Sequence, residues 1–119
     1  MDSTRKAVGD GRAERRIHPR APVRLEAGYE DQERQVFMAT RDVSEGGAYL
    51  QAPEPPEPGQ EARITLELPD REELLRIGGV VVRSDGKAGF ALRFDRRAMS
   101  ELARNQLREF VDRMRPATL

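Results

Sequence analysis

Residues 62–68 read ARITLEL, a stretch in which four apolar side chains alternate with three polar ones. The apolar members are Ala62, Ile64, Leu66 and Leu68. Successive side chains of a strand point to opposite faces, so this period of two predicts a strand with one buried face and one solvent-exposed face. Pro69 ends the pattern, because proline cannot donate a hydrogen bond to a sheet ladder. A half-buried strand needs partners in a sheet, and the flanking sequence supplies them.

Five further segments have strand-like patterns. They are residues 23–29, 33–40, 48–51, 77–83 and 88–94. Glu30-Asp31-Gln32 and Ser84-Asp85-Gly86 separate neighbouring segments as hairpin turns, and the prolines within residues 53–59 indicate a longer surface connection. Many short strands at near-regular spacing predict a six-stranded antiparallel β-barrel.

Near the C-terminal end the apolar period changes from two residues to three or four. The residues on this stripe are Met99, Leu102, Ala103, Leu107, Phe110, Val111 and Met114. The stripe predicts an amphipathic helix over about residues 97–115 that covers an open end or an edge of the barrel. Asp95 or Ser100 is expected to cap its start, and Pro116 to end it. The predicted fold class is therefore all-β with one C-terminal α-helix.

The chain has 119 residues, a length that fits one domain with a tail. Residues 1–14 contain very few apolar side chains, so we predict a flexible N-terminal tail there. Residues 15–115 are predicted to form the barrel domain with its helix, and residues 116–119 a short C-terminal tail.

The composition excludes several kinds of chemistry. There is no Cys, which rules out thiolate catalysis, disulfides and cysteine-based zinc sites. The single histidine, His18, cannot form a multi-histidine metal site, and the sequence offers it no partner for general-base catalysis. We therefore predict a protein that is not an enzyme, with no metal and no cofactor.

Hydropathy and charge limit the partners. No apolar run reaches the roughly 18 residues of a membrane span, and the polar start lacks the apolar stretch of a secretory signal. We therefore expect a cytoplasmic protein that does not insert into membranes.

The formal net charge is zero, with basic residues concentrated in 1–25 and 80–119 around an acidic middle. The basic ends suggest a nucleic-acid grip, but the acidic middle would repel a polyanion, so we expect no nucleic-acid partner.

The first of two polar clusters precedes the first predicted strand and reads Arg15-Arg16-Ile17-His18-Pro19-Arg20. Pro19 disfavours helical dihedrals at His18, so the segment is predicted to be extended. Arginine forks donate paired hydrogen bonds and stack on flat rings, which suits guanine and phosphate. The alternative interpretation is a solvated segment with weak surface ion pairs.

The second cluster follows the second predicted strand and reads Asp42-Val43-Ser44-Glu45-Gly46-Gly47. A carboxylate and a hydroxyl could accept hydrogen bonds from a ligand there. The alternative is ordinary turn chemistry, in which Asp42 and Ser44 bond nearby amides and Gly46 or Gly47 supplies a positive φ.

Together, and in this order, the clusters resemble the signature of the PilZ domain, RxxxR followed some twenty or more residues later by [D/N]xSxxG. The first motif matches residues 16–20 and the second residues 42–47, and the resemblance extends over about residues 14–115. It implies a six-stranded antiparallel barrel with a C-terminal helix that binds the bacterial second messenger cyclic di-GMP.

The resemblance also implies roles for individual residues. Arg16 and Arg20 would grip guanine edges and phosphates, while Asp42 and Ser44 would meet guanine N–H donors and nearby polar atoms. Gly47 would let the backbone approach the ligand. The full set of candidate ligand-binding residues is Arg15, Arg16, Arg20, Asp42, Ser44, Gly46, Gly47 and Arg93.

Arg93 is included because it shares a strand face with Gly89 and Ala91, whose small side chains leave space for a flat base.

Ligand binding is expected to order the N-terminal arm into a clamp and so to change the surface met by an unidentified protein partner, for example in motility or biofilm regulation. The alternative function is an adaptor that keeps the fold, binds no nucleotide and acts through protein–protein contacts alone. The sequence leaves monomer and dimer equally open.

Overall fold

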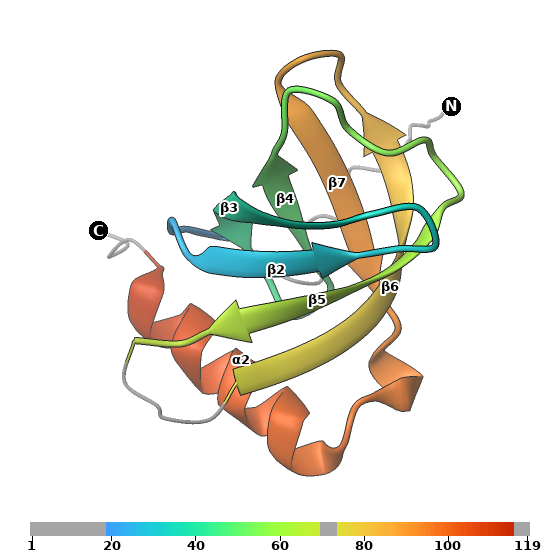
Figure 1. The fold of residues 1–119 in the computed structure, drawn as a ribbon. Helices are drawn as coiled ribbons and strands as arrows, with labels where there is room; N and C mark the ends of the chain where they lie inside the picture. The colour runs from blue at the N-terminus through green and yellow to red at the C-terminus, as the bar shows by residue number, and fades with distance from the viewer. Residues whose placement is uncertain (1–18, 70–73, 116–119) are drawn as a thin grey trace, which may run out of the picture.

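The computed structural model describes residues 19–69 and 74–115 (Figure 1). Seven strands lie within these ranges: β1 (Ala21–Pro22), β2 (Glu26–Glu30), β3 (Gln35–Val43), β4 (Gly47–Gln51), β5 (Glu61–Glu67), β6 (Leu74–Ser84) and β7 (Gly89–Phe94). A 3-10 helix, η1 (Arg96–Ala98), and an α-helix, α2 (Glu101–Met114), follow them.

The six longer strands form one closed antiparallel sheet. Neighbours pair in the order β3-β2-β5-β6-β7-β4, and β4 pairs back with β3 to close the ring. The two-residue β1 adds to β3, with Ala21 opposite Val43 and Pro22 opposite Asp42. The predicted six-stranded antiparallel barrel with one C-terminal helix is therefore confirmed, and β1 is an additional short strand.

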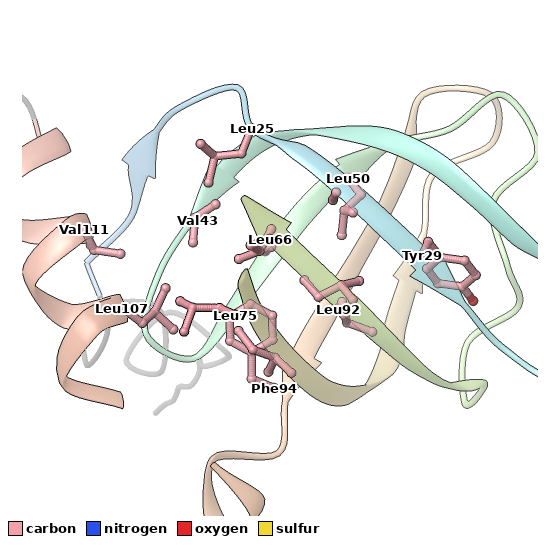
Figure 2. Close-up of a cluster of buried hydrophobic side chains, with 14 of the residues drawn as sticks. Leu25, Tyr29, Val43, Leu50, Leu66, Leu75, Leu92, Phe94, Leu107 and Val111 are labelled. Atoms are coloured by element: carbon pink, nitrogen blue, oxygen red, sulfur yellow. The ribbon is translucent and has the colours of Figure 1, made fainter. Parts of the chain in front are cut away.

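The barrel is filled by the alternating side chains that the sequence predicted. Ile64, Leu66 and Leu68 of the ARITLEL stretch are 0%, 0% and 1% exposed. Helix α2 lies across one open end of the barrel and directs Leu107 and Val111 toward Val43 and the other core side chains (Figures 1 and 2). Burial of a large apolar side chain stabilises a fold by about 1.5–3 kcal/mol, so this contact holds the helix in place.

The predicted start of the helix is wrong by a few residues. Arg96–Ala98 form the 3-10 helix, and Met99 is extended, with φ −84° and ψ 141°. Ser100 is the N-cap, because its side chain accepts a hydrogen bond from the N–H of Ala103 at 3.0 Å. Asp95 makes no side-chain cap at the preceding 3-10 turn. Of the two predicted caps, Ser100 is therefore the one that starts the α-helix.

The turn between β2 and β3 is organised by one carboxylate. Asp31 accepts hydrogen bonds from the N–H groups of Glu33 and Arg34 at 2.7 and 3.0 Å and from the hydroxyl of Tyr29 at 2.5 Å. Burial works to raise the pKa of Asp31, but these three donors outweigh it and the pKa lies below 3.8. The predicted hairpin turn at Glu30-Asp31-Gln32 is therefore present, and β3 starts at Gln35.

Candidate functional site

Pairing of β1 with β3 brings the end of the first polar cluster to the start of the second. Arg20 directly precedes β1, and its Nη1 lies 2.5 Å from Oδ1 of Asp42. The two side chains are 44% and 19% exposed, so the ion pair is open to solvent on the outside of the barrel. Residues 22 apart in sequence thus meet at one point.

The buried hydroxyl of Thr40 fixes the segment that carries Arg20. It donates to the carbonyl oxygen of Val23 at 2.7 Å and accepts from the N–H of Leu25 at 2.8 Å. The N–H of Val23 also donates to the carbonyl oxygen of Arg41 at 3.2 Å. The N–H of Thr40 donates in turn to the carbonyl oxygen of Leu25 at 2.9 Å, so four hydrogen bonds hold this part of the chain against β3.

Strand β3 is longer than predicted, and the second polar cluster is only partly a loop. Arg41, Asp42 and Val43 are strand residues, so the strand predicted to end at residue 40 continues for three more. Val43 is fully buried, whereas Asp42 faces outward. The polar residues at 41 and 42 obscured the strand in the sequence, because both side chains face solvent.

Ser44 holds the loop that follows. Its Oγ accepts hydrogen bonds from the N–H groups of Gly46 and Gly47 at 3.2 and 3.1 Å, and its own N–H donates to the carbonyl oxygen of Gly47 at 2.8 Å. Ser44 is 5% exposed. The turn chemistry considered for this residue is therefore present, while Asp42 bonds Arg20 rather than local amides.

Gly47 is needed for space rather than for φ. Among the glycines in the described ranges, those with a positive φ are Gly59, Gly86 and Gly89, so the positive φ expected at Gly46 or Gly47 is wrong. A Cβ on Gly47 would instead collide with the carbonyl oxygen of Leu92 on the neighbouring strand. Gly47 thus permits close approach of β7.

Arg93 lies on the same outer face as this loop. It is exposed and faces Gly47 on one side and Val80 on the other. A cavity of about 290 Å³ adjoins it, lined by Gly79, Val80, Arg93, Phe94 and Asp95. The space predicted beside Gly89 and Ala91 is absent, because both are buried and Tyr49 lies against them. The open space beside Arg93 comes from Gly79 and its neighbours.

A cluster that the sequence did not single out borders Asp42. Tyr49 lies directly opposite Asp42 in the β3–β4 register, and the guanidinium carbon of Arg41 lies 4.0 Å from the centre of its ring. The Tyr49 hydroxyl donates to Asp85 at 2.9 Å, and Nε of Arg83 lies 3.1 Å from the same carboxylate oxygen. An outward tyrosine between arginines is visible only once the strands are paired.

Ionisation equilibria are shifted within this cluster. Burial, with the hydrogen bond to Asp85, raises the pKa of Tyr49. The same hydrogen bond, together with Arg83, lowers the pKa of Asp85. The phenol and the carboxylate therefore keep a fixed donor–acceptor pair at neutral pH.

Arg15 and Arg16 lie outside the described residues, as does His18. Of the other candidates, Arg20 contacts Asp42, Gly47 faces Arg93, and Ser44 with Gly46 belongs to the loop between these pairs.

Within residues 19–69 and 74–115, no three His, Cys, Asp or Glu side chains gather as a metal site. In the same ranges, no helix is long and apolar enough to span a membrane.

A family model described as the PilZ domain matches residues 14–113. The chain belongs to the PilZ domain family. PilZ domains typically bind cyclic di-GMP and are generally non-catalytic binding domains. No match was found among curated protein sequences.

Two solved structures share the fold. The Bacillus subtilis inhibitor of motility, MotI/DgrA, is 18% identical with a TM-score of 0.67; the match covers 81% of this chain and 49% of that one. The chain thus spans about half the length of that protein. The PilZ domain of CeSA from a cellulose-synthesizing bacterium is 20% identical with a TM-score of 0.56, covering 80% of this chain and 92% of that domain. At these identities the likeness concerns the fold.

Proposed function

We propose that this PilZ domain is a receptor for cyclic di-GMP and that its ligand contacts are centred on Arg20 and Asp42. The observation that carries the proposal is the Arg20–Asp42 pair, in which one residue of each family motif meets the other on the outer face of the barrel. Both belong to the motifs by which this sequence resembles ligand-binding family members.

The chemistry of the pair suits guanine. A guanidinium fork donates to the O6 and N7 acceptors of guanine or to phosphate oxygens, and a carboxylate accepts from the N1 and N2 donors. Arg93 adds a cation beside the loop, at the edge of an open cavity. Arg15 and Arg16 precede Arg20 in the chain and complete the proposed set of cations, while Ser44, Gly46 and Gly47 shape the loop.

Release of the two side chains from each other costs little. An exposed ion pair contributes about 0–1 kcal/mol, whereas one hydrogen bond to a charged group contributes about 1.5–3 kcal/mol. Several such bonds to a dianionic dinucleotide therefore exceed what the free protein loses. The Arg20–Asp42 contact keeps both groups at the site until the ligand replaces it.

The output is proposed to be a change of surface. In this proposal, binding draws the residues that precede Arg20 across the barrel, and a partner protein recognises the resulting face. Ligand binding favours this state because the ligand contacts the arm and the barrel together.

The test is isothermal titration of the full chain with cyclic di-GMP, with Arg20→Ala, Asp42→Ala and the control Arg76→Ala. Arg76 is an exposed arginine of β6 that faces Thr65 across the sheet. We expect binding at micromolar or lower concentrations in the wild type and the control, and a loss of at least tenfold in the two site variants. Wild-type protein that is folded yet binds nothing at tens of micromolar would leave the adaptor function as the better description.

A further inference from the structure

Two β-bulges border one row of paired residues that crosses neighbouring strands of the barrel. The register of β3 with β4 shifts between Thr40 and Asp42, so Arg41 has no partner opposite it. The register of β6 with β7 shifts between Val81 and Arg83. The row itself runs across four strands through Asp42, Tyr49, Ala91 and Arg83. A β-bulge re-aims side chains, and here each bulge adds an outward residue next to that row.

Beside the two bulges, two guanidinium groups lie close to one ring. Arg41 approaches the Tyr49 ring to 4.0 Å and Arg83 to 5.8 Å. Tyr49 alternates with the core residues Ala48 and Leu50 and so belongs to the outer face, yet it is only 2% exposed. Arg41, by contrast, is exposed.

The ring under Arg41 is held firmly. The Tyr49 hydroxyl is bonded to Asp85, which Arg83 also bonds through Nε. The ring also packs close to Gly89, where an added Cβ would lie 3.0 Å from Cε1 of Tyr49. Arg41 therefore rests on a ring that is fixed in place, while its own side chain is exposed.

We propose that Arg41, seated on Tyr49, is a stacking surface for one purine of the bound dinucleotide, directly beside Asp42. The inference rests on the proposed function and assigns a ligand contact outside both family motifs. A guanidinium plane stacks on a base through dispersion and cation–π attraction. Asp42 is the next residue along β3 and faces the same side, so it reaches the edge of a base whose face lies on Arg41. Tyr49, Arg83 and Asp85 are positioning residues.

The experiment compares Arg41→Ala, Arg41→Lys and Tyr49→Phe with wild type and Arg76→Ala, by isothermal titration with cyclic di-GMP. Arg41→Ala is expected to weaken binding about tenfold. Arg41→Lys is expected to weaken binding as much, because an ammonium has the charge but no flat face. Tyr49→Phe keeps the ring but loses the hydrogen bond to Asp85 that holds it, so it is expected to weaken binding a few-fold, less than Arg41→Ala. Unchanged melting temperatures in the Arg41 variants exclude unfolding as the cause.

Binding of Arg41→Ala within twofold of wild type, or full binding of Arg41→Lys, would overturn the stacking role while the proposed function stands. Absence of binding in wild type would end both.

Discussion

The hydroxyl of Thr40 donates to the carbonyl oxygen of Val23 at 2.7 Å, across the gap between β3 and the segment that leads from β1 to β2. Thr40 is 1% exposed, so neither group can turn to water. The same hydroxyl accepts from the N–H of Leu25, so it serves as donor and acceptor at once. One buried side chain therefore helps to hold the segment that follows Arg20 and β1 against β3.

Replacement of Thr40 by valine keeps the shape of the side chain and removes both hydrogen bonds. Two buried backbone groups then lose their partners, which is expected to lower the free energy of unfolding by about 1–3 kcal/mol. Urea denaturation measures this. Thr65→Val, at a half-buried position on the outer face of β5, is the control and should change stability far less. Equal stabilities of Thr40→Val and wild type would contradict the role given to Thr40.

Exchange of Arg20 and Asp42 separates ion pairing from ligand chemistry. Arg20→Asp and Asp42→Arg alone are each expected to cost about 0–1 kcal/mol of stability, because the pair is open to solvent. The double variant restores the pair and should regain that stability. Its cyclic di-GMP binding should remain lost, because donor and acceptor now face the wrong edges of the base. Thermal melts and titrations check the two parts, and retained binding in the double variant would refute the assignment.

Glycine to alanine changes test the close approach of β4 and β7. Gly47→Ala forces its Cβ against the carbonyl oxygen of Leu92, which is backbone and cannot rotate away. Overpacking of this kind is expected to cost about 1–3 kcal/mol. Gly78→Ala is the matched control, since a Cβ there meets nothing within 4 Å. Its stability should equal or slightly exceed that of wild type; similar losses in both variants would contradict the packing argument.

Both tyrosines are expected to resist ionisation. Burial first, and then a hydrogen bond to Asp31 or Asp85, raises the pKa of Tyr29 and Tyr49 above 10.0. A raised pKa in the folded state contributes stability below pH 10 that is lost as pH rises through the folded value. In an absorbance titration at about 295 nm, both phenols of the folded protein should therefore reach their midpoints above pH 10. If either tyrosine side chain titrated at its ordinary pKa while the protein stayed folded, this prediction would be contradicted.

The strands were predictable wherever one face meets the core and the other meets water. In β5 the alternation of apolar and polar residues follows the in–out alternation of the side chains, so sequence and structure agree. In β7 the inward residues Phe90, Leu92 and Phe94 were predictable in the same way, but Gly89 and Ala91 on the other face are buried as well. The α-helix was predictable from its stripe, but its start was not. Met99 occupies a helical spacing and is buried, yet it lies in extended backbone before the Ser100 cap.

The candidate site was predictable only in part. The motifs located Arg20 and Asp42. The spacing between two short motifs cannot show, however, that β1 pairs with the C-terminal end of β3 and so brings these residues together. Arg41 and Tyr49 escaped notice because their contact depends on a bulge, which interrupts the simple period of two. Arg93 was predicted on the correct face of its strand, but the open space beside its side chain adjoins Gly79 rather than Gly89.

The bulge in β3 leaves the inward–outward phase of the strand intact. Thr40 faces inward, Arg41 and Asp42 both face outward, and Val43 returns to the interior. A chain shortened by Arg41 alone would still send Thr40 and Val43 inward and Asp42 outward. The extra residue is thus accommodated entirely on the outer wall, so the length of this strand can differ by one residue while the side chains that fill the interior stay the same.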